Sequence, residues 1–80
     1  MDLPVSQYPS LKAQEVLRRL AQFGYGAERT RGSHRKLTAD GRPDIWFSYH
    51  HGDTVPPRAL RKILVKDAQF SENEISRFIS

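Results

Sequence analysis

A histidine flanked by cations follows a glycine-serine pair near the middle of the sequence. His34 comes directly after Gly32-Ser33, and the cations on either side of it are Arg29, Arg31, Arg35 and Lys36. An imidazole exchanges protons near neutral pH, and guanidinium and ammonium groups bind phosphate. RNA supplies its own nucleophile in the 2′-hydroxyl, so a base and a few cations suffice to cleave a phosphodiester. The pattern predicts His34 as a catalytic residue and the four cations as phosphate contacts.

The same residues also allow less specific interpretations. A histidine in a hairpin is most often only a polar surface residue, and a glycine such as Gly32 is most often only a turn residue. A basic run is frequently no more than a solvated surface. The residues by themselves therefore leave three classes open: a ribonuclease, a non-catalytic RNA-binding module, and a protein-interaction domain whose basic hairpin meets an acidic partner.

Three further residues are candidates for the same site. His50 and Ser33 could assist the chemistry, and Trp46 could stack on a base, although an exposed tryptophan can also simply cover a sheet. His50, His51 and Asp53 could also be interpreted as metal ligands. Adjacent residues of a strand point to opposite faces, however, and zinc prefers three or four converging ligands. We therefore expect no metal and no cofactor.

Composition limits the class of protein. The chain has 80 residues, of which 38% are hydrophobic and 28% are charged, and this predicts one globular domain. Cysteine is absent, which fits a reducing cytoplasm. No apolar run approaches a membrane span, so we expect a cytoplasmic protein without a membrane partner. The net charge of +4 favours a polyanionic partner such as RNA.

Helix signals stand before and after a region with strand patterning. Residues 1–10 predict a flexible leader, and residues 11–80 a single domain. Apolar residues at helical spacing follow Ser10, a candidate cap, and Gly24 is the expected end of that helix. Strands are predicted over residues 25–31, 33–38 and 44–50, joined by short turns, of which Asp40-Gly41 is the clearest.

The second half of the chain predicts two helices. Pro56-Pro57 begins one with a buried stripe, and Ser71 and Glu74 have capping-box spacing for a short last helix. The predicted order is α-β-β-β-α-α, an α+β domain with a three-stranded antiparallel sheet and its helices on one face. Alternation in the strands places five residues on the open face: His34, Lys36, Trp46, Ser48 and His50.

The spacing of glycine, aromatic, arginine and histidine residues is similar to a known family. The pattern G-[aromatic]-x-x-x-R-x-x-G-S-H, at Gly24, Tyr25, Arg29 and Gly32 to His34, resembles the HicA (YcfA-like) toxins. The resemblance covers residues 12–75. His50 matches a second histidine of the family, and residues 55–71 match its proline, leucine-arginine and isoleucine-leucine pattern. The chain departs from the family at Arg35-Lys36, Ser48-Tyr49 and Gln69.

The resemblance has implications for fold, activity and partner. It implies a fold like that of double-stranded-RNA-binding domains and a toxin of a type II toxin–antitoxin system. It further implies an endoribonuclease that cleaves messenger RNA, an mRNA interferase, with His34 as the catalytic residue. The partner that it implies is a HicB-like antitoxin that blocks the active face.

Overall fold

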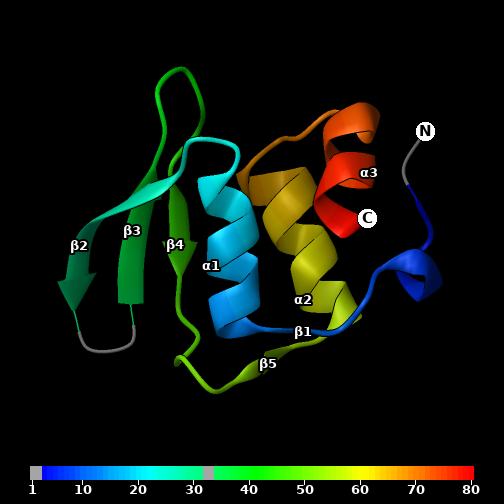
Figure 1. The fold of residues 1–80 in the computed structure, drawn as a ribbon, viewed down its shortest axis with the longest axis horizontal. Coiled ribbons are helices and arrows are strands. Elements are labelled where there is room, and N and C mark those ends of the chain that lie inside the picture. The colour runs from blue at the N-terminus through cyan, green and yellow to red at the C-terminus, as the bar shows by residue number, and fades with distance from the viewer. Residues whose placement is uncertain (1–2, 32–33) are drawn as a thin grey trace.

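The structure is a computed structural model that describes residues 3–31 and 34–80, with the side chains of residues 28–31 left outside the description. The sequence predicts a turn at Gly32-Ser33 and an assisting role for Ser33. Both residues lie outside the described residues. In chain order the elements are the 3₁₀ turn η1 (Val5–Gln7), β1 (Leu11–Lys12), α1 (Ala13–Ala21), β2 (Gly26–Arg31), β3 (His34–Thr38), β4 (Ile45–Phe47), β5 (Thr54–Val55), α2 (Pro57–Arg61), the π-helical segment η2 (Lys62–Asp67) and α3 (Glu72–Ile79) (Figure 1).

Two antiparallel sheets form within the described residues. The larger has the strand order β2-β3-β4, and the smaller pairs β1 with β5. In the larger sheet, Lys36 lies opposite Trp46 and Leu37 opposite Ile45. The predicted class, an α+β domain with a three-stranded antiparallel sheet, is confirmed, and the β1–β5 pair is an addition that the sequence patterning did not predict.

The helices pack on one side of the three-stranded sheet, as Figure 1 shows. Alternation along the strands buries Leu37, Ile45 and Phe47, while Trp46 on the other face is 58% exposed. The helices contribute many of the other core residues from their apolar stripes, among them Val16 and Leu20 of α1, Leu60, Ile63 and Leu64 of α2 and η2, and Ile75 and Phe78 of α3. The sheet therefore has a buried helix-side face and an open outer face.

Helix α1 begins later than the sequence predicts and ends as predicted. Its N-cap is Lys12 rather than Ser10, and no side chain caps it. At its end Gly24 adopts a φ of 97°. The Gly24 N–H donates to the Ala21 carbonyl and the Tyr25 N–H to the Leu20 carbonyl. This is the Schellman arrangement, in which glycine is favoured because it has no Cβ, and it turns the chain directly into β2.

Strand β4 is shorter than predicted. The expected strand over residues 44–50 is confined to Ile45–Phe47. Phe47 pairs with Arg35, and Tyr49 and His50 lie beyond the last residue of β4. These two residues therefore leave the sheet, and strand alternation does not determine where His50 points.

Part of the predicted leader belongs to the folded core. Tyr8, which follows the turn η1, is only 3% exposed. Leu11 then pairs with Val55, which joins the start of the domain to the segment that leads into α2. The segment before α1 thus packs against the domain from Tyr8 onward.

The second helix changes its hydrogen-bonding pattern halfway. The sequence predicts one regular helix, whereas α2 ends at Arg61 and continues as the π-helical segment η2. The Ala68 N–H donates to the Ile63 carbonyl at 2.8 Å, a spacing of five residues. Lys62 and Asp67, at the same spacing, form an ion pair at 3.0 Å. None of the helices that residues 3–31 and 34–80 form is long and apolar enough to cross a membrane.

Helix α3 begins with the predicted capping box. The Ser71 hydroxyl accepts from the Glu74 N–H, and the Glu74 carboxylate accepts from the Ser71 N–H. The same carboxylate binds Arg42 at 2.6 Å, and the Arg42 guanidinium lies over the ring of Phe70. These contacts attach the β3–β4 turn to the start of α3.

Candidate functional site

His34 is the first residue of β3 and stands at one end of the sheet. It lies opposite Arg31 in the pairing of β2 with β3, and its side chain is exposed. The turn that precedes it falls outside the described residues. An exposed imidazole in this position has open access to a large substrate.

Lys36 and Trp46 share the outer face with His34. Lys36 is two residues beyond His34 on the same strand, which places both side chains on one side of the sheet. Lys36 lies directly opposite Trp46, and its ammonium group is 3.6 Å from the Asp44 carboxylate. The row from His34 through Lys36 to Trp46 combines a proton-transfer group, a cation and an exposed ring. We call these three residues the outer row.

The backbone positions of two predicted phosphate contacts are next to this row. A β-bulge between Ala27 and Arg29 shifts the register of β2. As a result Arg29 lies opposite Lys36, and Arg31 lies opposite His34. The strand pairing therefore brings both arginine positions alongside the outer row.

Arg35 is separated from the other predicted phosphate contacts by the sheet. It lies opposite the buried Phe47, and together with Leu37 it lines a cavity against α1. Alternation along β3 explains this, because a strand that buries Leu37 must turn Arg35 toward the same helix-side face. The same alternation is visible in the sequence, where Arg35 and the apolar Leu37 are two residues apart.

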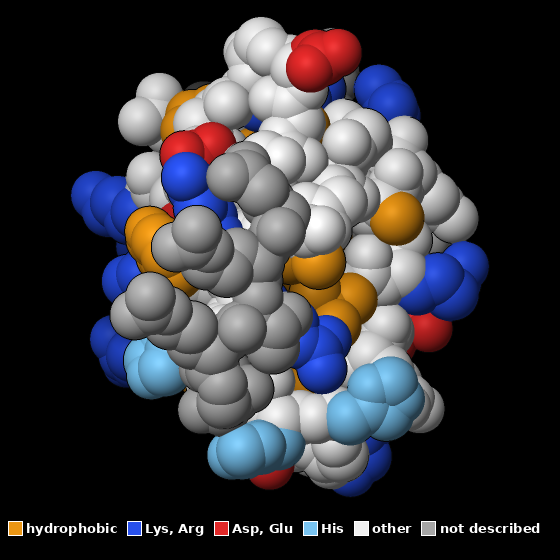
Figure 2. All heavy atoms as spheres, turned by 90° about the vertical axis from the view of Figure 1, so that its left-hand side faces the viewer, with side chains coloured by type: hydrophobic (Ala, Val, Ile, Leu, Met, Phe, Trp, Pro, Cys, Tyr) orange, Lys and Arg blue, Asp and Glu red, His pale blue; other side chains and the backbone are white. Residues whose placement is uncertain are grey.

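His50 and His51 lie in the loop that follows β4. The His50 N–H donates to the Asp53 carboxylate at 2.8 Å, and the Asp53 N–H donates back to the His50 carbonyl at 3.0 Å, which closes a tight turn. In Figure 1 this loop and the β2–β3 hairpin end lie at the same end of the molecule. Figure 2 shows histidine side chains gathered along the lower part of the adjoining face.

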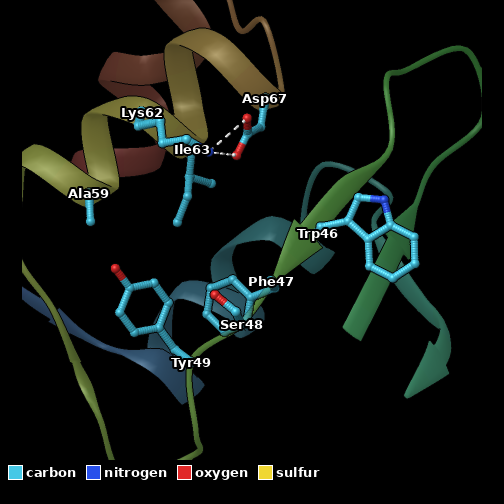
Figure 3. Close-up of a pocket in the computed structure, with 8 residues that line it drawn as sticks. All are labelled: Trp46, Phe47, Ser48, Tyr49, Ala59, Lys62, Ile63 and Asp67. Atoms are coloured by element: carbon cyan, nitrogen blue, oxygen red, sulfur yellow. Dashed lines mark hydrogen bonds and ion pairs between the residues drawn. The ribbon is translucent and has the colours of Figure 1, made fainter. Parts of the chain in front are cut away.

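A small cavity lies between β4 and the second helix. It measures about 230 Å³ and is lined by Phe47, Ser48 and Tyr49 on one side and by Ala59 and Ile63 on the other. Figure 3 shows Tyr49 and Ile63 turned into this cavity, and Trp46 borders it from β4. Trp46 lies opposite Lys36 and is 58% exposed. Trp46 is thus directed to the outer face, as the sequence predicts.

Several cations elsewhere in the fold are bound to carboxylates. The guanidinium groups of Arg18 and Arg19 both contact Glu15 and hold the pKa of that carboxyl at about 2. Arg42 likewise lowers the pKa of Glu74. Among the described residues, no group of three or more histidine, aspartate or glutamate side chains is arranged to hold a metal ion.

These features define a class of protein, a small basic α+β domain with an exposed histidine beside a cationic sheet face. A family model described as the HicA toxin of bacterial toxin-antitoxin systems matches residues 13–70, which is most of the chain. The protein belongs to the HicA toxin family. Comparison with curated proteins and with solved structures found no match.

Family membership brings two statements with it. HicA toxins are ribonucleases, and a toxin of a toxin–antitoxin system has an antitoxin as its partner. The matched region contains both His34 and His50 together with the whole three-stranded sheet.

Proposed function

We propose that this protein is an endoribonuclease toxin that cleaves messenger RNA at the outer face of its sheet, with His34 as the catalytic residue. The observation that carries the proposal is the outer row, in which His34, Lys36 and Trp46 share one face at the open end of β3. An imidazole, a cation and an exposed ring are the groups needed to move a proton, bind a phosphate and stack on a base.

The proposed reaction uses the nucleophile that RNA carries. His34 takes the proton of a 2′-hydroxyl, whose oxygen attacks the adjacent phosphorus, and the 5′-oxygen leaves with a proton. The products are a 2′,3′-cyclic phosphate and a new 5′-hydroxyl end. Lys36, with Arg29 and Arg31, would offset the charge that develops on the phosphate.

Two residues are proposed to assist. Ser33 precedes His34 directly in the sequence, and His50 lies in the loop at the same end of the molecule. Either could donate a hydrogen bond to the phosphate or a proton to the leaving oxygen. We assign Trp46 to base stacking, because it is exposed and projects from the same face as Lys36.

The proposed protein partner is a HicB-like antitoxin. A cell that makes a ribonuclease must block it, and the net charge of +4 favours an acidic protein on the active face. Partner binding should then slow hydrogen exchange over residues 34–36. Slower exchange confined to the exposed sides of α1 and α2 would contradict this.

Substitution of the histidines one at a time tests the catalytic assignment. General acid–base catalysis by one group contributes about 10² to 10⁴-fold, so His34→Ala should lose cleavage of a long RNA by that factor. His50→Ala should lose less. His51→Ala is the matched control and should be nearly silent.

The fold and the RNA affinity of His34→Ala should change little, because the side chain is exposed. Circular dichroism and a binding titration check both. Cleavage by His34→Ala at the parent rate would disprove the assignment.

A chelator tests whether the reaction needs a metal ion. The proposed chemistry uses only the 2′-hydroxyl and protein groups, so cleavage should be unchanged in excess chelator and should yield cyclic phosphate ends. Mass spectrometry of the fragments identifies those ends. Loss of cleavage in chelator, with recovery on adding zinc or magnesium, would instead indicate metal-assisted hydrolysis.

A further inference from the structure

A second cavity lies on the helix-side face of the sheet, between α1 and the β2–β3 hairpin. It measures about 270 Å³. Its walls are mainly apolar and include Leu17, Leu20, Ala27 and Leu37. Among the described residues that line it, the one charged side chain is Arg35. The outer row is on the opposite face of β3, so this cavity is separate from the proposed RNA site.

Arg35 differs from three other arginine and lysine residues whose carboxylate partners are known. Arg19, Arg42 and Lys62 each bind a carboxylate at 3.0 Å or less. Within the part of the chain that the structure describes, the Arg35 side chain forms no such pair and no hydrogen bond. It is nevertheless half-buried at the edge of an apolar cavity. A partly desolvated guanidinium gains most from a carboxylate brought to it in bidentate geometry.

We propose that this cavity is a docking pocket for an aliphatic side chain of a protein partner, with an adjacent carboxylate of that partner bound to Arg35. The partner is the antitoxin, and in this respect the inference rests on the proposed function. The volume is below the range of about 300–1,000 Å³ that is usual for small-molecule sites. It suits one buried anchor of the kind that dominates protein interfaces.

The lining favours a protein over RNA. A base needs a stacking surface and donors or acceptors for its edges, whereas the walls here are mainly aliphatic. The one aromatic ring in the lining belongs to Tyr25, and its hydroxyl already donates to the Pro43 carbonyl at 2.6 Å. An acidic, aliphatic segment of a protein matches both the apolar walls and the cation.

The position of Arg35 explains how such a partner would regulate the toxin. Arg35 directly follows His34 in β3. A segment of the partner that binds Arg35 therefore lies close to the end of the sheet where His34 stands. The partner would then cover His34 on the active face, while its anchor in the cavity adds binding energy from the opposite face.

A small probe tests the pocket without knowledge of the partner's sequence. The probe is 4-methylpentanoate, which combines a leucine-like branch with a carboxylate. In an NMR titration we expect saturable shifts at the amides of Ala21, Gly26 and Ala27, which line the cavity. The neutral analogue 4-methylpentan-1-ol and the short anion acetate should each bind at least fivefold more weakly.

Two pairs of variants test separately the contact of Arg35 with the carboxylate and the binding of the apolar group in the cavity. Arg35→Gln should weaken binding of 4-methylpentanoate at least fivefold. Lys36 is the next residue of the strand but lies on the outer face, so Lys36→Gln should leave this binding unchanged. Ala21→Met should fill the cavity from the last turn of α1 and reduce binding similarly. Gln22→Met, an exposed neighbour outside the lining, is its control.

Several outcomes would overturn the proposal. They are the absence of saturable shifts, equal binding of acetate, equal binding of the alcohol, or an unchanged affinity in Arg35→Gln. Shifts of the same amides that depend on protein concentration without probe, together with a doubled mass in sedimentation, would identify a second copy of this chain as the occupant instead.

The same variants then apply to the complex. A HicB-like antitoxin is co-expressed with the toxin, and its affinity for the toxin should fall at least tenfold with Ala21→Met but not with Gln22→Met. RNA cleavage by Ala21→Met alone should equal that of the parent. An unchanged affinity would disprove the docking pocket, whereas an inactive parent would disprove only the proposed ribonuclease function.

Discussion

At the scale of single residues, neighbouring side chains on one strand have different tasks. Lys36 lies on the outer face opposite Trp46, while Arg35 lines the cavity under α1. The two cations are adjacent in the sequence but are separated by the sheet, because strand residues alternate between faces. Substituting both at once would therefore mix an effect on RNA with an effect on a protein partner.

Glu15 supports a prediction about pH. Hydrogen bonds from Arg18 and Arg19 lower its pKa from an ordinary value of 4.5 to about 2. The ionised carboxylate therefore stabilises the fold above pH 4.5, and this contribution is lost as the pH falls toward 2. Glu15→Gln should have a lower Tm than the parent at pH 7, and the difference should shrink over that range.

Thermal unfolding followed by circular dichroism from pH 7 to pH 2 measures the difference. The parent and the variant have every other carboxylate in common. The effect of acid on those groups therefore cancels in the difference between the two Tm values. A difference in Tm that stays constant across the whole range would show that the charge of Glu15 does not matter.

At the scale of elements, the second helix ends in an unfavourable backbone conformation. Gln69 has a φ of 55°, the left-handed region in which glycine is normally found after a helix. The wider π-helical turn leads into it, and the Phe70 N–H reaches back to the Leu64 carbonyl at 2.9 Å. This hydrogen bond accompanies the burial of the Phe70 ring in the core. The free energy gained by burying the ring offsets the strain at Gln69.

Glycine at this position should relieve the strain. A left-handed conformation costs a side-chain-bearing residue about 1–2 kcal/mol, part of which is offset by the greater freedom of glycine in the unfolded chain. We expect Gln69→Gly to stabilise the protein by about 0.5–1 kcal/mol in urea unfolding. Gln22→Gly, at a φ of −68°, is the matched control and should destabilise it. Destabilisation by both substitutions would refute this explanation.

Helix α3 is attached to the domain at both ends. Arg42 binds Glu74 at its start, and the Arg19 guanidinium donates to the carbonyls of Phe78 and Ile79 at its end. A cation suits the second role, because a C-terminal turn exposes carbonyl groups and carries partial negative charge. At the start of the helix, Arg42 is bound through the carboxylate of Glu74. Arg19 and Arg42 therefore have a structural role.

At the scale of the whole molecule, charge should govern RNA affinity. Each phosphate contact on a single strand changes the slope of log K against log salt by about −0.7. Lys36→Gln should therefore flatten the slope by about that amount and leave stability nearly unchanged. Lys66→Gln, an exposed lysine of η2, preserves the net charge of the first variant and should leave the slope unaltered.

Binding titrations at several salt concentrations measure this slope for the two variants and the parent. Equal flattening by both substitutions would show that only the net charge matters. A localised contact at the outer row would then be excluded.

Much of the architecture could be predicted from local signals. The order of helices and strands, the stop at Gly24 and the capping box at Ser71 and Glu74 each depend on residues close together in the chain. Backbone preference and hydrogen bonding within one turn determine such features, and they are visible without the rest of the fold. Family membership was also recognisable, from the spacing around His34.

The tertiary structure decided the features that depend on distant partners. The length of strand β4 depends on its pairing with β3, and Tyr8 is buried because the domain covers it. The separation of Arg35 from Lys36 follows from which face of β3 the helices pack against. The sequence by itself determined which groups are present and which elements they occupy, whereas packing across long chain separations determined which side chains share a surface.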